Sequence, residues 1–163
     1  MRLCRHRLWD EADAHRALPA EALRRLAARV AESEQRHGGE IRVCVEASLP
    51  LSYLWRRASA RERAVTLFGK LRVWDTEQNN GVLIYLLLAE HAIEIVADRG
   101  LNQRVSAEQW HTVIGSLREA LQAGRFEDGL VAAIGQVEQL LAHQFPTNGA
   151  PPRNELPNAV VVL

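Results

Sequence analysis

The sequence predicts an α/β protein in which a mixed β-sheet is sandwiched between helices. The first observation is the apolar run at residues 82–88, which lacks alternation and is typical of a strand covered by helices on both faces. The second is that segments with helical periodicity lie between and after the strands, in the order α-β-α-β-β-α-α. At 163 residues, 47% of them hydrophobic, the chain has the size and apolar content of one globular domain.

The N-terminal half contributes a helix, a strand and then an irregular segment. Apolar residues recur at helical spacing through residues 20–30, and Gly38 with Gly39 is expected to end that helix. Residues 41–46 alternate apolar and polar side chains, which predicts a strand with one buried face. Residues 49–57 are expected to form a loop.

Capping patterns mark the start of two further helices. Ser59 with Glu62, and Ser106 with Gln109, have the spacing at which two side chains satisfy each other's free backbone amides. The first of these helices is expected to continue to about Val73. The side chains expected to form its apolar stripe are Val65, Phe68 and Leu71.

Residues 82–88 and 93–98 are predicted to form a β-hairpin that reverses at Glu90. A strand, a crossover helix and a second strand usually give parallel neighbours with a right-handed connection. The strand at residues 41–46 should therefore run parallel to the first strand of the hairpin and antiparallel to the second. A last helix is expected over about residues 127–143.

One domain is expected over residues 18–146, with a tail on either side. Residues 1–17 are polar and are expected to form an N-terminal tail. Residues 147–163 are rich in proline, which predicts a mostly irregular C-terminal tail. Its apolar end, AVVVL, can dock on the domain either as a short strand or as an apolar plug.

Polar side chains are concentrated where two predicted strands begin and the third ends. Given the predicted strand directions, these positions share one edge of the sheet. The residues expected at this edge are His37, Glu40, Asp75, Asn79, Asn80, Asp98 and Arg99. Carboxylate and amide oxygens are the ligands that Ca²⁺ or Mg²⁺ prefers. The alternative is that the same residues cap turns and supply left-handed turn geometry, and the residues alone leave both interpretations open.

A basic cluster surrounds the start of the second predicted long helix. It consists of Arg56, Arg57, Arg61 and Arg63, with Glu62 among them. Such a cluster can hold a phosphate or an acidic partner, or it can be a solvated helix face. The formal net charge of the chain is zero, which argues against nucleic acid as the partner.

The apolar segments of the chain are short. The N-terminal residues contain no apolar run of the length that a secretory signal needs, and the longest apolar run, residues 82–89, is far below the roughly 20 residues of a membrane helix. We therefore expect a cytoplasmic protein without a membrane span.

An Asn-Gly step leads into the first hairpin strand, and a Gly-Leu turn follows the second, at Asn80–Gly81 and Gly100–Leu101. In these features the chain, over roughly residues 20–145, resembles the TPM domain family, named from a plant thylakoid-lumen protein, a photosystem II repair factor and a worm receptor modulator. The segments GEIR, VWDTE and NELPNAVVVL are similar to a bacterial cytoplasmic branch of that family. Members of this branch are often encoded beside a LemA-like protein and a secreted TPM protein.

The resemblance implies two hypotheses for function. The first is a non-catalytic cytoplasmic interaction module linked to a membrane- or envelope-associated system, with a LemA-like or secreted TPM-family protein as its partner. The second follows from the calcium binding and acid phosphatase activity linked to family members. In this metal-dependent phosphatase, Asp75 and Asp98 hold the ion, Glu40 or His37 acts as acid or base, and Arg99 binds phosphate. The turn after Gly100 lacks the acidic residues that secreted members commonly place there, which weakens the transfer of calcium binding.

Overall fold

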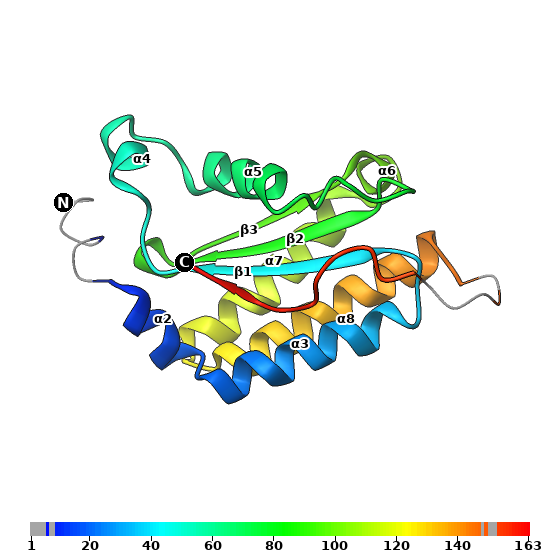
Figure 1. Ribbon diagram of the computed structural model, residues 1–163, viewed down its shortest axis with the longest axis horizontal. Coiled ribbons are helices and arrows are strands. Elements are labelled where there is room, and N and C mark those ends of the chain that lie inside the picture. Colours follow the sequence, from blue (N-terminus) through cyan, green and yellow to red (C-terminus); the bar gives the residue numbers. More distant parts are fainter. Residues whose placement is uncertain (1–5, 7–8, 148, 150–152) are drawn as a thin grey trace.

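The computed structural model describes residues 6, 9–147, 149 and 153–163, and its centre is a four-stranded mixed sheet in the order β3-β2-β1-β4 (Figure 1). Strand β1 (Glu40–Glu46) runs parallel to β2 (Gly81–Leu87), with Ile41 opposite Val82. Strand β3 (Ala92–Ala97) returns antiparallel to β2. The predicted directions of these three strands are confirmed.

Helices cover both faces of this sheet, as Figure 1 shows. Three long helices, α3 (Ala20–Glu34), α7 (Ala107–Gln122) and α8 (Phe126–Gln144), lie on one face. Helix α5 (Ala60–Lys70) lies on the other. The shorter elements are α2 (Glu11–Ala17), α4 (Leu51–Trp55), the 3-10 turn η1 (Leu88–Glu90) and α6 (Arg99–Asn102). The predicted fold class, a mixed sheet between helices, is confirmed.

Two helices lie where the sequence predicted irregular chain. Helix α2 forms inside the predicted N-terminal tail because Asp10 and Asp13 make a reciprocal capping box, and its Ala14 is buried. Residues 1–5 and 7–8 of that tail lie outside the described residues. Helix α4 forms inside the predicted loop at residues 49–57, where Pro50 precedes its first turn.

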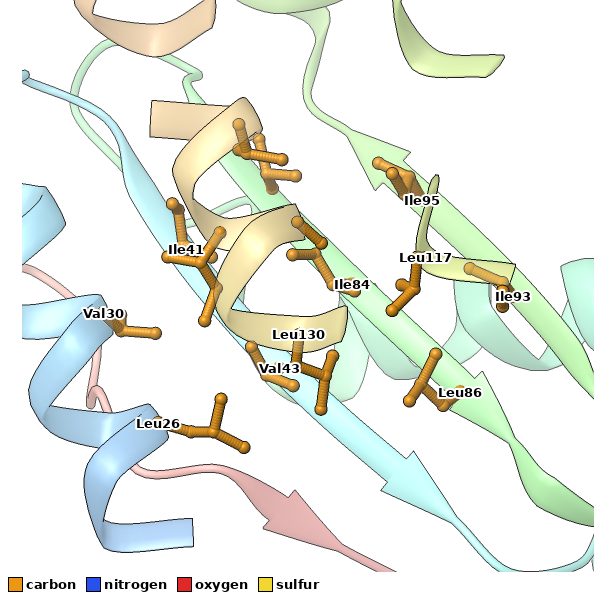
Figure 2. Close-up of a cluster of buried hydrophobic side chains, with 14 of the residues drawn as sticks. Leu26, Val30, Ile41, Val43, Ile84, Leu86, Ile93, Ile95, Leu117 and Leu130 are labelled. Carbon is orange, nitrogen blue, oxygen red and sulfur yellow. The ribbon is translucent and has the colours of Figure 1, made fainter. Parts of the chain in front are cut away.

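The larger apolar core fills the space between the sheet and helices α3, α7 and α8 (Figure 2). Ile41 and Ile84 point into it from β1 and β2, and Leu26, Leu117 and Leu130 meet them from the three helices. Each of these five side chains is at most 1% exposed. Burial of this extent is the main stabilising contribution to such a sandwich, at about 1.5–3 kcal/mol for each large side chain.

A smaller core lies beneath α5 and contains Leu83 and Tyr85 of the sheet. The residues of α5 that are buried against it include Ala64 and Leu67. Of the predicted apolar stripe, Phe68 and Leu71 pack against this core, whereas Val65 is 51% exposed and lies outside the buried face. Small and apolar residues at positions 60, 64 and 67 let the helix approach the sheet closely.

Residues 153–163, here called the C-terminal strap, run along the open edge of β1 (Figure 1). Their end forms β4 (Val161–Val162), which pairs in parallel with Cys44 and Val45. The backbone amide of Leu163 donates to the Val45 carbonyl at 3.0 Å. This pairing covers an edge that would otherwise present free backbone groups to other chains. Residues 148 and 150–152 of the predicted tail lie outside the described part of the chain.

Across the described segments, we find no helix whose length and apolarity would let it cross a bilayer.

Candidate functional site

The strand directions bring the predicted polar residues to one end of the sheet, here called the rim. Glu40 begins β1 opposite Gly81, the first residue of β2. The backbone amide of Asp98, just after β3, donates to the Gly81 carbonyl at 2.9 Å. Glu40, Gly81 and Asp98 therefore lie side by side across three strands.

The rim residues nevertheless divide between the two faces of the sheet. Successive residues of a strand point to opposite faces. By this alternation Glu40 and Asp98 belong to the α5 side, where Cys44 and Val96 are buried. Asn80 belongs to the side of α3 and α8, since Val82 is buried there. The sheet itself thus separates the two acidic side chains from Asn80.

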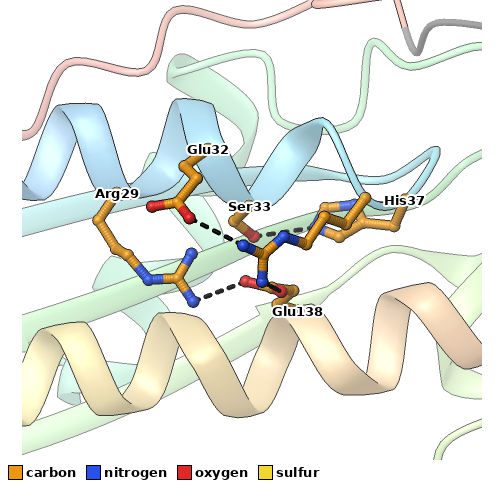
Figure 3. A network of polar contacts seen from close by, with 6 residues as sticks. Arg29, Glu32, Ser33, His37 and Glu138 are labelled. Atoms are coloured by element: carbon orange, nitrogen blue, oxygen red, sulfur yellow. Dashed lines mark hydrogen bonds and ion pairs between the residues drawn. The ribbon is translucent and has the colours of Figure 1, made fainter.

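His37 lies on the α3 and α8 side and is fully buried. Its Nδ1 accepts a hydrogen bond from the Gly39 amide at 3.1 Å, and its Nε2 lies 3.0 Å from Ser33 Oγ (Figure 3). Burial lowers the pKa of His37 from 6.5 to about 4. A neutral ring that accepts at Nδ1 carries its proton on Nε2 and donates it to Ser33. Both nitrogens are engaged, so the ring holds the turn into β1.

Beside His37, an ion-pair network joins α3 to α8 (Figure 3). Arg29 and Arg36 donate to the two carboxylate oxygens of Glu138, at 2.6 and 2.9 Å. Burial raises the pKa of Glu138, but the two arginine hydrogen bonds outweigh it and bring the pKa below its usual value. Glu138 is therefore a charged carboxylate whose role is to fasten the two helices.

Glu40 holds the C-terminal strap through both of its carboxylate oxygens. The backbone amides of Glu155 and Leu156 donate to Oε1 and Oε2 at 2.9 and 3.2 Å. Two residues along β1, Arg42 donates to the carbonyls of Pro157 and Ala159. A carboxylate that accepts strap amides and a guanidinium that donates to strap carbonyls together bind this segment by its backbone.

A second carboxyl, Glu34, is buried next to Glu40. The backbone amide of Ile41 donates to Glu34 Oε1 at 2.9 Å, and Oε2 has no hydrogen-bond partner among the described residues. Burial raises the pKa of Glu34 to about 8, and the neighbouring Glu40 charge adds to the rise. Burial also raises the pKa of Glu40, against the effect of the two strap amides. Near neutral pH the pair therefore retains a proton, which limits the repulsion between the two carboxyls.

The other predicted rim residues serve the turns at the sheet end. Asp98 caps α6, accepting from the Arg99 amide at 2.6 Å. Asn79 has a positive φ of 52° in the turn before β2, and the Asn80 side chain donates to the Gly38 carbonyl at 2.7 Å. Asp75 is exposed and lies 3.6 Å from Arg72. Arg99 is exposed on the first turn of α6.

Two glycines at the rim permit close backbone contacts. A Cβ on Gly81 would lie 2.0 Å from the carbonyl oxygen of Val73, at the end of the α5 segment. A Cβ on Gly100 would lie 2.5 Å from the carbonyl oxygen of Asn79. The Asn-Gly and Gly-Leu steps of the sequence therefore mark places where two backbones meet, and any side chain there would force them apart.

The rim has no ready cation site in the described part of the chain. No group of three or more His, Cys, Asp or Glu side chains there lies close enough to hold a metal ion. The buried acceptors Asn80 Oδ1 and Asp98 Oδ2 have no hydrogen-bond partner among the residues that the structure describes, but they belong to opposite faces of the sheet. Binding of Ca²⁺ or Mg²⁺ by the predicted residues stays a prediction.

The predicted basic cluster separates into three environments. Arg63 is buried and donates to Glu46 of β1, which also accepts from the Tyr85 hydroxyl at 2.6 Å. Arg61 donates to the Ile95 carbonyl and lies 3.5 Å from Glu94. Arg56 and Arg57 remain exposed at the end of α4. The four arginines thus do not form one anion site.

Sequence reasoning missed the buried polar residues Glu34, Arg42, Glu46 and Tyr85. In β1 the polar residues alternate with apolar ones, a pattern that usually indicates a solvent-facing side. Here that side is covered by α5 and the C-terminal strap, and all seven residues of β1 are buried. The one feature of the sequence that could have indicated this burial was the apolar end of the strap, which predicts that the strap itself docks on the sheet.

The fold and the rim together define the class of this protein. It is an α/β sandwich with a mixed sheet, and at the rim two glycines pack closely against neighbouring backbone. A family model described as the TPM domain matches residues 12–140. The structure is also similar to the NMR structure of the BA42 protein from the psychrophilic bacterium Bizionia argentinensis, with a TM-score of 0.79 and 29% identity. That likeness covers 90% of this chain and 95% of the other. No curated protein matches. The chain belongs to the TPM domain family.

Proposed function

We propose that this TPM-domain chain is a non-catalytic cytoplasmic module that binds a protein of a membrane- or envelope-associated system. The observation that carries the proposal is that the charged groups near the sheet are engaged in contacts within the chain. Glu40 and Arg42 hold the strap, Glu46 and Arg63 hold α5, and His37 is neutral with both nitrogens engaged. Groups committed to intramolecular contacts are poor candidates for proton transfer or phosphate binding.

The surface that fits a protein partner lies along α5 and the turn that follows it, and is here called the α5 ridge. Its apolar side chains recur every third residue: Val65, Phe68, Leu71 and Trp74. Val65 is 51% and Trp74 50% exposed, while Phe68 and Leu71 are half-buried. Trp74 Nε1 donates to the Gly69 carbonyl at 3.3 Å, which holds the indole against the end of the helix. Pre-positioned aromatic and aliphatic side chains of this kind are typical anchors of protein interfaces.

The test is recovery of a partner from cells with the tagged full chain as bait. A LemA-like protein and a secreted TPM-family protein are the first candidates to look for. We expect the double variant Val65→Ser with Trp74→Ala to lose the partner, because it removes both exposed ends of the ridge. The matched control is Trp55→Ala, which removes an exposed tryptophan outside the ridge. Failure to recover any partner under several conditions, or equal losses with both variants, would contradict the proposal.

A metal-dependent phosphatase is the second candidate, and one observation favours it. Asp98 Oδ2 is a buried carboxylate oxygen without a partner among the described residues, and such an oxygen is available to a hard cation. Calorimetry with Ca²⁺, Mg²⁺ and Mn²⁺, run beside a phosphate-ester assay, decides between the two candidates. Micromolar binding abolished by Asp98→Asn supports the enzyme, and no heat at millimolar metal excludes it.

A further inference from the structure

Helix α4 presents the most exposed large apolar side chains of the described structure. Trp55 is 83% exposed and Leu51 67% exposed. The two residues are four positions apart, so they lie on the same side of the helix. Figure 1 shows α4 beyond the end of the sheet where β1 and β2 finish, at the far end of the molecule from the rim. We call Leu51, Trp55, Arg56 and Arg57 the α4 tip.

The α4 tip is held in place by the rest of the structure. Leu54 is 6% exposed and belongs to the smaller core, against which Tyr53 also packs. After the helix, Arg57 has a positive φ of 54°, and the Ala58 amide donates back to the Tyr53 carbonyl at 2.9 Å. Because the inner side of the helix is anchored and its end is closed, Trp55 and Leu51 are presented outward by defined backbone geometry.

The charge next to these apolar side chains is positive. Arg56 and Arg57 directly follow Trp55, and neither forms a salt bridge within the described part of the chain. The Arg56 guanidinium lies 4.4 Å from the centre of the Tyr53 ring, in a cation–π contact that holds it beside the helix. The other two arginines of the cluster are engaged by Glu46 and Glu94, so the free positive charge is concentrated at the tip.

We propose that the α4 tip docks the chain on an anionic lipid surface. Trp55 and Leu51 enter the headgroup region, and Arg56 and Arg57 contact lipid phosphates. Tryptophan favours the membrane–water interface, and arginine keeps its charge among headgroups while its apolar stem lies on hydrocarbon. The anionic cytoplasmic leaflet attracts such cations. The proposal rests on the proposed membrane-linked function and adds the surface that brings the chain to the bilayer.

The size of the tip favours a bilayer over a protein as its occupant. A stable protein interface buries about 800 Å² on each partner. A five-residue helix with two exposed apolar side chains offers much less than that. A bilayer needs no matching shape, and shallow insertion of a few side chains combined with electrostatic attraction suffices for reversible binding.

The experiment is co-sedimentation of the purified full chain with vesicles. Vesicles of phosphatidylglycerol and phosphatidylcholine are compared with vesicles of phosphatidylcholine alone. We expect binding only to the anionic vesicles, and weaker binding at high salt because screening reduces the attraction. Substitution of Arg56 or Arg57 by alanine should weaken binding about fivefold each. Trp55→Ala should abolish it, whereas the matched control Trp74→Ala should leave it unchanged.

Tryptophan fluorescence supplies a second measurement on the same samples. Anionic vesicles should shift the emission of the unmodified chain to shorter wavelength, and the shift should be absent in Trp55→Ala. Failure of the unmodified chain to sediment with anionic vesicles, or equal weakening by Trp55→Ala and Trp74→Ala, would overturn the proposal. Loss of a cellular protein partner in Trp55→Ala, without vesicle binding, would assign the tip to a protein and also overturn it. The vesicle assay contains no protein partner, so its failure is separate from a failure of the α5 ridge.

Discussion

The guanidinium of Arg63 on α5 meets the carboxylate of Glu46 on β1 in a two-point contact, with Nη2 2.6 Å from Oε1 and Nε 2.9 Å from Oε2. The Tyr85 hydroxyl donates to the same carboxylate from β2. Hydrogen bonding to Glu46 raises the pKa of Arg63, and burial raises the pKa of Tyr85. The contact thus fixes α5 on the sheet through a carboxylate that three donor groups satisfy.

Removal of one partner from this contact should be strongly destabilising. Arg63→Ala leaves the buried Glu46 carboxylate only partly satisfied by hydrogen bonds. We expect a loss of about 3–5 kcal/mol in the free energy of unfolding, measured by urea denaturation. The control is Arg61→Ala, because the Arg61–Glu94 contact is partly exposed and should contribute less than about 1 kcal/mol. Similar losses in both variants would contradict this account of the buried contact.

Gly81→Ala should disrupt the rim. The added methyl group would lie 2.0 Å from the Val73 carbonyl oxygen, so either β2 or the segment after α5 must move. We expect a loss of about 3 kcal/mol or more in the free energy of unfolding. Gly115→Ala on α7 is the matched substitution, since, apart from the adjoining backbone of the same helix, no atom of the described chain lies within 4 Å of its added methyl group. That variant should gain about 0.5–1 kcal/mol, and the prediction is wrong if the two variants behave alike.

Arg42→Ala should loosen the C-terminal strap without unfolding the domain. The substitution removes charge-assisted hydrogen bonds to the Pro157 and Ala159 carbonyls. Bonds of this kind contribute about 1.5–3 kcal/mol, so local opening should increase by about tenfold or more. The measurement is hydrogen exchange of the Leu163 amide, which donates to Val45 across the strap contact. Arg72→Ala is the control. If Arg42→Ala left the hydrogen-exchange protection of the Leu163 amide unchanged, Arg42 would not be the residue that holds the strap.

Glu34 should make the protein less stable as pH rises. Its pKa is about 8 in the folded state because of burial, against 4.5 for an ordinary glutamate, so the folded chain binds more protons between these values. The stabilising contribution is complete below pH 4.5 and is lost as pH rises through 8. Glu34→Gln keeps the acceptor for the Ile41 amide and removes the titration. We expect the decline in urea midpoint to be much smaller in this variant.

The effect of Glu34 on the urea midpoint should be measured above pH 6.5. The pKa of His37 is lowered from 6.5 to about 4, so below pH 6.5 this residue makes stability increase with pH and opposes the effect of Glu34. About one pH unit above 6.5 the ring is also neutral in the unfolded state, and His37 then contributes almost no slope. Glu32→Gln, an exposed neighbour on α3, is the control. An equal decline in Glu34→Gln and the unmodified chain would show that another group is responsible.

The elements that the sequence predicted well are those with strong local signals. The apolar run of β2 and the capping pairs Ser59–Glu62 and Ser106–Gln109 each specify local backbone geometry. Gly38 and Gly39 do not end the first long helix as predicted, because α3 stops at Glu34 and neither glycine has a positive φ. The parallel arrangement of β1 and β2 followed from the handedness of crossover connections. Helices α2 and α4 were missed because each is a short helix in a polar or proline-flanked segment.

The sequence predicted where in the fold the candidate site residues lie, but it did not predict which groups surround them. Glu40 and Asp98 do reach the same end of the sheet, flanking Gly81. Their hydrogen-bond partners were not predictable, because Glu40 contacts Glu155 across 115 positions of sequence. Whether a carboxylate meets a cation, a solvent molecule or a backbone amide depends on which distant segment packs beside it.

The sequence by itself determined the helices and strands with strong signals, their order and the directions of the three main strands, because periodicity, caps and glycine geometry act over a few residues. Only the tertiary structure decided the role of each polar side chain. Alternation in β1 identifies two faces, but it cannot show that α5 and the C-terminal strap cover the polar one. Burial sets the pKa of Glu34 and the pairing of Arg63, and burial is a property of the packed chain as a whole.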